Sequence, residues 1–209
     1  MTLEWTWDKI GEGATRWTFP AKVSSGTYCG YKEGTELVMK VVKTSEFKKG
    51  IRLSQSDIQA QQLAAQYADE FNKKQPLTKC GQTCGIYFRT AKLTTADDDK
   101  KQGGVTRIVK GEQMLVEQRI FGEYEKFNSN SGWSQGEVSA PDCFSHWTWV
   151  HSGGEYLVCD LQGHRGRPGG PKCDGEVYYY LLTDPVVLSR KQEFGCNDLG
   201  QPGIETWFA

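Results

Sequence analysis

Alternating and periodic apolar positions divide the chain into strand-like and helix-like segments. In the first fifty residues, side chains alternate over 10–23, and a turn at Gly34 precedes a β-branched run that ends at Lys43, so strands are predicted. Residues 56–74 have helical periodicity instead, with apolar side chains at i, i+4, i+7, i+8 and i+11. These five are Ala60, Ala64, Tyr67, Ala68 and Phe71. Ser56 to Gln59 has the form of a capping box, and Pro76 ends the helix.

The strand pattern returns in residues 84–120, on both sides of Thr94–Gly104. The charges and glycines of that segment predict a solvated hairpin loop. Residues 142–163 then predict a helix, a Gly-Gly turn and a strand. Strands, a helix, more strands and a mixed final part together predict an α+β fold with two lobes, an N-lobe of about 1–121 and a C-lobe of about 122–209.

Composition and charge narrow the class of protein. A chain of 209 residues with 37% hydrophobic content suits a single domain with a real core. The net charge of -1 gives no electrostatic argument for nucleic acid, and no apolar run approaches the roughly 20 residues of a spanning helix, so neither nucleic-acid binding nor membrane insertion is expected. Seven irregularly spaced cysteines favour thiols in a reducing cytoplasm over a disulfide framework.

Lys40 stands within an apolar strand-like run. With a period of two, Val38 and Val42 lie on its side of the strand. A lysine in this setting is either an edge-strand residue with its ammonium in water or a buried ligand for a phosphate group. Lys43, on the opposite face, is the rival phosphate ligand.

Two apolar runs end in an aspartate. Asp160 follows residues 157–159, and Asp184 follows 181–183. Gln162 is two residues beyond Asp160, so on an extended chain their side chains share a face. Carboxylate and amide oxygens suit Mg²⁺, but aspartates also cap turns routinely, and the residues alone leave both interpretations open.

Several blocks, taken in order, resemble the alpha-kinase family. These atypical protein kinases include myosin heavy chain kinases, the elongation-factor kinase and the kinase domains of TRP-melastatin channels. The blocks are EGATR, VMKVV, AAQYADEFN, LVEQRIFGEYEKFNSNSG, FSHWTW, LVCDLQG, LLTDP and FG-x-x-x-LG-x-x-GI. The resemblance covers the chain from about Ile10 to Phe208, which implies one alpha-kinase catalytic domain over residues 1–209.

The resemblance implies an ATP site in the first half of the chain. Arg16 resembles the arginine that reaches the nucleotide phosphates, and Lys40 resembles the strand lysine that contacts the α- and β-phosphates, which favours it over Lys43. Glu117 and Arg119 fall on the family's segment between the lobes, where backbone groups bind adenine.

The resemblance assigns the chemistry to the second half. Asp160 resembles the catalytic aspartate, which orients the acceptor hydroxyl. Gln162 and Asp184 resemble the Mg²⁺ ligands. Residues 126–132 resemble an asparagine-rich loop.

The late glycine-rich loop of the family is associated with peptide-substrate binding. Gly195, Gly200 and Gly203 correspond to it. Asp198 departs from the family pattern, so we expect it to add negative charge near the substrate.

Two further departures concern zinc and an insertion. His146 corresponds to one ligand of the family's structural zinc, but the three other ligands, from a His-x-Cys-x-x-x-Cys segment, do not occur in these residues. We therefore expect no zinc here. Residues 164–178 lengthen the segment before Asp184 and, being rich in glycine and proline, predict a mobile surface loop whose basic residues could bind an acidic substrate segment.

The resemblance thus implies an ATP- and Mg²⁺-dependent serine/threonine protein kinase, with ATP and a protein hydroxyl as its partners. The alternative is an ATP-binding module with little catalysis. A metal-dependent hydrolase built on Asp160 and Asp184 would explain neither Lys40 nor the late glycines.

Overall fold

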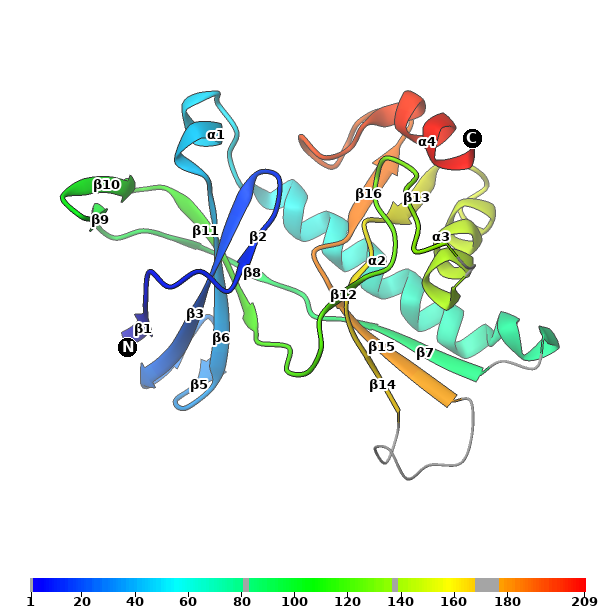
Figure 1. The fold of residues 1–209 in the computed structure, drawn as a ribbon, viewed down its shortest axis with the longest axis horizontal. Coiled ribbons are helices and arrows are strands. Elements are labelled where there is room, and N and C mark those ends of the chain that lie inside the picture. The colour runs from blue at the N-terminus through cyan, green and yellow to red at the C-terminus, as the bar shows by residue number, and fades with distance from the viewer. Residues whose placement is uncertain (1, 81–82, 137–138, 168–176) are drawn as a thin grey trace. The chain divides into compact units, whose positions relative to one another are not determined.

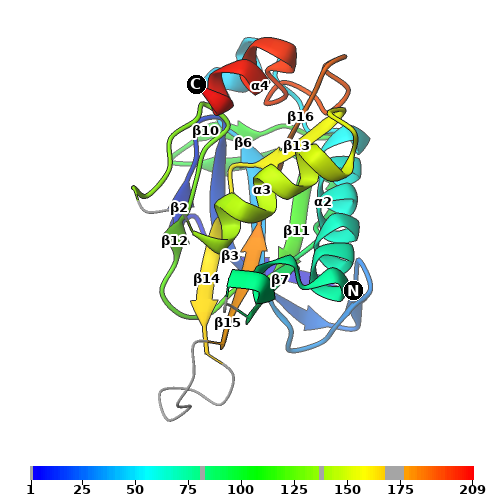
Figure 2. The same ribbon diagram turned by 90° about the vertical axis from the view of Figure 1, so that its right-hand side faces the viewer.

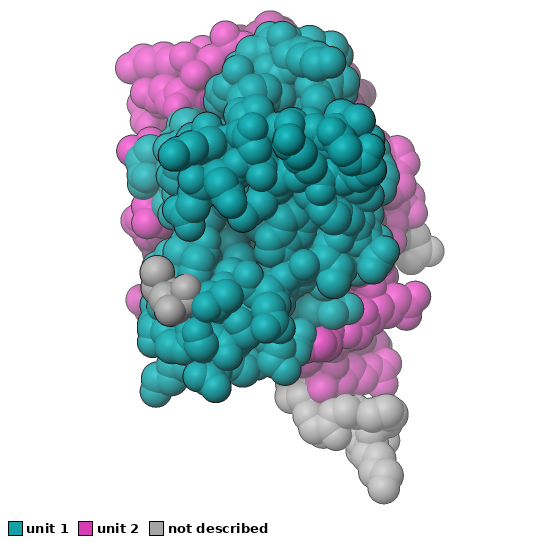
Figure 3. Space-filling view, turned by 90° about the vertical axis from the view of Figure 1, so that its left-hand side faces the viewer, with its two compact units in different colours: residues 1–58, 91–119 teal, residues 59–90, 120–209 magenta. Residues whose placement is uncertain are grey.

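The computed structural model of the protein describes residues 2–80, 83–136, 139–167 and 177–209. The chain divides into unit 1, residues 1–58 and 91–119, and unit 2, residues 59–90 and 120–209 (Figure 3). The sequence predicts a single boundary near residue 122, but residues 59–90 belong to unit 2. They do so because the buried face of the main helix and the strand after it pack and pair within unit 2.

Unit 1 is built on a six-stranded antiparallel sheet (Figure 1). Across the sheet the strands are β1 (Thr2–Trp5), β3 (Arg16–Ser25), β6 (Glu36–Val42), β11 (Gln113–Gln118) and β8 (Lys92–Thr95), with β2 (Gly11–Glu12) paired to β3. The register places Lys40 of β6 between Thr18 of β3 and Leu115 of β11. β6 is therefore an interior strand, as its β-branched composition favours.

The two faces of this sheet differ in chemistry. One face is apolar and holds a core cluster that includes Phe19, Met39 and Val116, over which Trp5 and Trp7 pack. The opposite face carries a smaller apolar cluster that includes Val42 and Leu115. Since side chains alternate along a strand, Lys40 lies on the same face as Val42.

Short elements complete unit 1. They are the hairpin strands β4 (Thr27–Tyr28) and β5 (Tyr31–Lys32), the hairpin strands β9 (Lys100–Gln102) and β10 (Val105–Ile108), and helix α1 (Thr44–Lys48). The charged segment Thr94–Gly104, predicted to be a loop, thus contains strand β9. Gly103 and Gly104, both with positive φ, form the turn into β10.

Unit 2 contains a four-stranded sheet in the order β12 (Glu125–Lys126), β14 (Gln162–Gly166), β15 (Val177–Thr183) and β7 (Thr83–Phe88). β7 and β15 are parallel, whereas the other pairs are antiparallel. A separate antiparallel pair joins β13 (Tyr156–Cys159) to β16 (Val186–Ser189).

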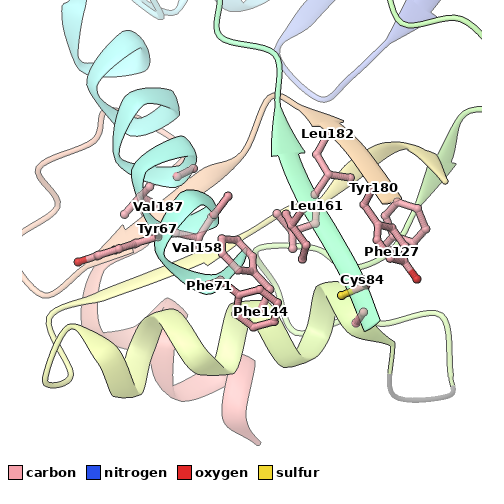
Figure 4. Packing of buried hydrophobic residues seen from close by; sticks show 14 of the residues in the cluster. Tyr67, Phe71, Cys84, Phe127, Phe144, Val158, Leu161, Tyr180, Leu182 and Val187 are labelled. Carbon is pink, nitrogen blue, oxygen red and sulfur yellow. The ribbon is translucent and has the colours of Figure 1, made fainter. Parts of the chain in front are cut away.

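Helices of unit 2 pack on these strands (Figure 2). They are α2 (Gln55–Lys74), which begins in unit 1, α3 (Ala140–His151), α4 (Gly200–Phe208) and the short 3₁₀ helix Pro76–Cys80. Phe71 of α2 and Phe144 of α3 meet edge to face at 5.4 Å in the centre of the core (Figure 4). All five apolar residues of the predicted helical face are buried, which confirms that prediction. Among the described residues, no helix is long and apolar enough to cross a membrane.

The start of α2 differs from the predicted capping box. Ser54, rather than Ser56, caps the helix, because its Oγ accepts a hydrogen bond from the Ser56 N–H (3.3 Å). The Ser54 N–H in turn donates to Asp57 Oδ2 (2.9 Å), which completes a reciprocal cap two residues earlier than expected. Gln75, with φ of 44°, ends the helix just before Pro76.

Candidate active site

Lys40 is buried in unit 1 and forms an ion pair. Its Nζ lies 2.7 Å from Glu117 Oε1, and the two side chains are only 4% and 2% exposed. The interpretation of Lys40 as an edge-strand lysine is therefore wrong. Glu117 lies within strand β11 rather than in a connecting segment, and its side chain fixes the lysine, a role that the sequence did not indicate.

Lys43, the rival lysine, is in a different environment. Its Nζ lies 2.7 Å from Oε1 of the half-exposed Glu12. The ammonium groups of Lys43 and then Lys9 lower the pKa of Glu12 to about 2. Lys43 therefore pairs with Glu12 at the end of strand β2.

Arg16 and Arg119 lie at strand ends in unit 1. Arg16 opens β3, and its Nη1 is 4.0 Å from Oδ1 of Asp57 in the first turn of α2. Arg119 follows β11, and its backbone N–H donates to Glu36 O (3.1 Å). The structure thus places Arg16 beside a helix N-terminus, where anions are favoured.

Asp160 and Asp184 share an unusual backbone conformation in unit 2. Each follows the end of a strand, β13 and β15 respectively, and their φ angles are 57° and 54°. This left-handed region is uncommon for residues other than glycine and costs about 1–3 kcal/mol. Backbone strain of this kind concentrates at functional sites, so the two aspartates indicate a functional site in unit 2.

The carboxylate of Asp160 is held by two neighbours. Lys126 Nζ lies 2.8 Å from its Oδ1, and Gln162 Nε2 donates to its Oδ2 at 3.3 Å. Asp160 and Gln162 do meet, although the corner is not extended as expected. Gln162 pairs across the sheet with Lys126 and with Thr183, the residue before Asp184.

The oxygens at these corners suit a hard divalent cation. Two carboxylates and one amide supply the donor types that Mg²⁺ prefers. Gln162 turns its NH₂ group toward Asp160, so its amide would have to rotate to offer Oε1 to a metal. In the part of the chain that is described, His, Cys, Asp and Glu form no group of three or more that could hold a metal.

Asn128 is a buried polar residue next to this corner, within the asparagine-rich segment 126–132, and its family resemblance alone assigns it no contact. Its Oδ1 accepts a hydrogen bond from the Leu161 N–H (3.0 Å), and its Nδ2 donates to Asp142 Oδ1 and Ser145 Oγ, both at 3.1 Å. Within the same asparagine-rich segment, Asn130 Nδ2 donates to Asn197 O (3.2 Å). This segment therefore contacts both the Asp160 corner and the late loop.

The late glycines do not all lie in a loop. Gly195 is in the loop, but Gly200 begins α4 and Gly203 lies within it. A Cβ at Gly203 would come within 2.5 Å of Leu199 Cβ, so this glycine permits close packing. The assignment of Gly200 and Gly203 to a loop is wrong.

Asp198 is buried and does not add surface charge. It is 3% exposed, and its carboxylate accepts hydrogen bonds from Ser189 N and Oγ and from the N–H groups of Phe194 and Gly200. The carboxylate therefore does not face solvent, and whether its charge lies near a substrate stays a prediction. Asp198 instead folds the loop between β16 and α4.

Two further departures from the family pattern concern His146 and residues 164–178. His146 is exposed on α3, and its ring lies edge to face with Phe208 of α4 at 5.8 Å. Residues 164–166 and 177–178 belong to strands β14 and β15, so the predicted loop over 164–178 is wrong at both ends. Residues 168–176, with most of that predicted loop, lie outside the described residues.

Solved structures confirm the fold. The alpha-kinase domain of myosin-II heavy chain kinase A in complex with AMP-PNP superposes with a TM-score of 0.76 at 23% identity, over 99% of this chain and 82% of that one. The chain therefore has the α+β fold of a kinase catalytic domain, as predicted.

Sequence comparison gives the family. The alpha-kinase family profile matches residues 11–209, and the chain belongs to the alpha-kinase family. Alpha-protein kinase vwkA of Dictyostelium discoideum is 32% identical over 188 residues, 87% of this chain and 26% of that protein. Eukaryotic elongation factor 2 kinase of Rattus norvegicus is 28% identical over 158 residues, 73% of this chain and 17% of that protein. The chain thus spans about a quarter or less of these relatives.

Proposed function

We propose that residues 1–209 form one catalytic domain that transfers the γ-phosphate of ATP to a serine or threonine hydroxyl of a protein. One observation carries the proposal. The Asp160 carboxylate sits on a strained corner, held by Lys126 and Gln162, and remains 20% exposed, so a substrate hydroxyl can reach it. Related structures support ATP as the donor, because the alpha-kinase domain of myosin heavy chain kinase A is described in complex with AMP-PNP and with ATP.

Phosphoryl transfer depends mainly on positioning and on neutralising charge. Lys40, held rigidly by Glu117, and Arg16 would bind phosphate oxygens, while backbone groups from Glu117 to Arg119 would bind adenine. Gln162 and Asp184 would hold Mg²⁺, which when bound supplies positive charge to the phosphates. Asp160 would orient the acceptor hydroxyl and take its proton as the new O–P bond forms, while the bond between the γ-phosphorus and the β–γ bridging oxygen breaks and ADP leaves.

Structures of myosin heavy chain kinase A also support a requirement for aspartate side chains in catalysis. Two aspartate-to-alanine forms of that domain are described as inactive, each in complex with ATP. We propose the same dependence for Asp160 in this chain. The proposed location is the cytoplasm, supported by Cys84 and Cys159, which are both buried and carry free thiols rather than disulfides.

A phosphorylation assay tests the proposal. Radiolabelled ATP, Mg²⁺ and a basic general protein substrate are incubated with the wild type, with Asp160→Asn and with Asp69→Asn, a control at an exposed position on α2. Wild type and Asp69→Asn should label serine or threonine, whereas Asp160→Asn should lose about 10²–10⁴-fold in kcat. If ATP binds by calorimetry but wild type and Asp160→Asn label equally, the chain is the alternative ATP-binding module with little catalysis.

A further inference from the structure

The corner that carries Asp160 has its backbone hydrogen bonds supplied by one short segment. Leu161, fully buried, is the anchor of that corner. Its carbonyl oxygen accepts from Phe127 N (2.8 Å), and its N–H donates to the side chain of Asn128 (3.0 Å). A left-handed residue such as Asp160 persists only where its surroundings over-determine it, and these bonds do so.

Both the amide oxygen and the NH₂ group of Asn128 form hydrogen bonds. It is 1% exposed, its oxygen accepts from Leu161, and its NH₂ group donates to Asp142 and Ser145 of α3. Asp142 is itself fixed, because it accepts from the N–H and Oγ of Ser139 at the N-cap of α3. The amide therefore links the Asp160 corner to the beginning of α3. A carboxylate or a hydroxyl could not replace it, because neither combines one acceptor with two donors.

We propose that Asn128 is a positioning residue for phosphoryl transfer, which fixes the direction of the Asp160 and Gln162 side chains through the Leu161 backbone. The inference rests on the proposed function. Asn128 contacts neither the phosphates nor the acceptor in this role. It sets the geometry of the corner, and small displacements of a catalytic group reduce turnover strongly while leaving nucleotide binding intact.

The chain offers a matched control in Thr148. Its Oγ1 is also fully buried and accepts a hydrogen bond from a backbone N–H, that of Val158 (3.0 Å), two residues before Asp160. Val158 lies within β13, where pairing with β16 also holds the backbone. Thr148→Val should therefore weaken folding much as Asn128→Ala does, without moving the corner.

Steady-state kinetics of the two variants test the inference. We expect Asn128→Ala to lower kcat by about 10–100-fold with KM for ATP changed less than about threefold, and to need more Mg²⁺ for half-maximal rate. Thr148→Val should keep kcat within about twofold. Circular dichroism and urea unfolding establish that both variants are folded at the assay temperature.

A measurement independent of catalysis accompanies the kinetics. In wild type, hydrogen exchange followed by NMR should show a protected Leu161 amide, and Asn128→Ala should lose that protection while the amides of β13 keep theirs. If Asn128→Ala does not fold, Asn128→Ser replaces it in both measurements.

The outcomes separate the two proposals. Active wild type with equal kcat in the Asn128 variant, or with an equal loss in Thr148→Val, overturns the positioning role alone. A wild type that binds ATP but labels no acceptor overturns the proposed function and the positioning role of Asn128 with it.

Discussion

Each unit contains a lysine–carboxylate pair of nearly the same length in a different environment. In unit 1 Lys40 lies 2.7 Å from Glu117, with both side chains almost fully buried. In unit 2 Lys126 lies 2.8 Å from Asp160, with 44% and 20% of the two side chains exposed. The two distances alone would predict the same interaction energy. The energies differ because the first pair is desolvated and the second is in contact with water.

The environment decides what each pair can do. A buried ion pair has lost its hydration, so removal of one partner leaves a stranded charge. Lys40 is thereby held in one geometry, which suits a group that must meet a phosphate without rearranging. A solvated pair exchanges partners at little cost, so Lys126 can hold Asp160 and still release it to a substrate.

The largest expected effect is on the buried pair. Lys40→Met should destabilise the fold by about 3–5 kcal/mol, because Glu117 loses its ion pair with Lys40 while it stays buried. The double variant Lys40→Met/Glu117→Leu should regain most of that stability and still have no kinase activity. Urea unfolding and the phosphorylation assay measure both. Equal stability of the single and double variants would contradict the burial argument, and Lys43→Met, whose carboxylate partner Glu12 is 45% exposed, serves as the control.

A smaller effect is expected where a buried carboxylate in unit 1 has no lysine. Glu112 is 5% exposed, its Oε2 accepts from Val109 N, and its Oε1 has no hydrogen-bond partner in the described chain. Desolvation by burial raises the pKa of Glu112, only partly opposed by the Val109 hydrogen bond and by Arg52. Glu112→Gln should therefore stabilise the fold at pH 7 by about 1 kcal/mol.

The pH dependence of that gain has a definite sign. A carboxyl whose folded pKa is raised favours folding at low pH, and this contribution is lost as the pH rises through the folded pKa. The advantage of Glu112→Gln should thus be largest at neutral pH and shrink toward pH 4. Urea midpoints at several pH values measure it, with the exposed Glu4→Gln as control. An advantage that grows on acidification would refute the sign.

The smallest effect is expected for the solvated pair. Lys126→Met should change the unfolding free energy by at most about 1 kcal/mol. In a double-mutant cycle with Asp160→Asn, the coupling should be about 0.2–1 kcal/mol at low salt and become weaker in 0.5 M NaCl, because mobile ions screen exposed charges. A coupling that does not change with salt would show that this pair is not solvated in solution.

Local sequence patterns predict the helices and strands better than the contacts that each of them makes. The main helix was readable because its apolar side chains repeat with the helical period, and the interior strand because it is β-branched. The sequence does not locate the cap, because Ser54 and Ser56 both begin acceptable capping sequences and only the hydrogen bonds distinguish them.

The site was predictable in residue type but not in contacts. The aspartates, Gln162 and Lys40 were named from the chain. The pairing of Lys40 with Glu117 depends on the register of β6 and β11, which the sequence does not reveal. Asp198 departs from the family pattern, which predicts negative charge near the substrate, but the sequence does not reveal that Ser189, nine residues earlier, donates a hydrogen bond to its buried carboxylate. The role of Asn128 cannot be predicted from the sequence, because its hydrogen-bond partners lie in distant segments of the chain.

The parallel pairing of β7 with β15 has a consequence for how the chain folds. The chain passes between units after Ile58, Thr90 and Arg119, so every strand of unit 1 has been synthesised once residue 119 has left the ribosome. β7 must wait for Val177–Thr183, far later in the chain. Contacts so distant in sequence form slowly, and an unpaired strand invites aggregation in the meantime. Unit 2, rather than unit 1, should therefore limit the rate of folding.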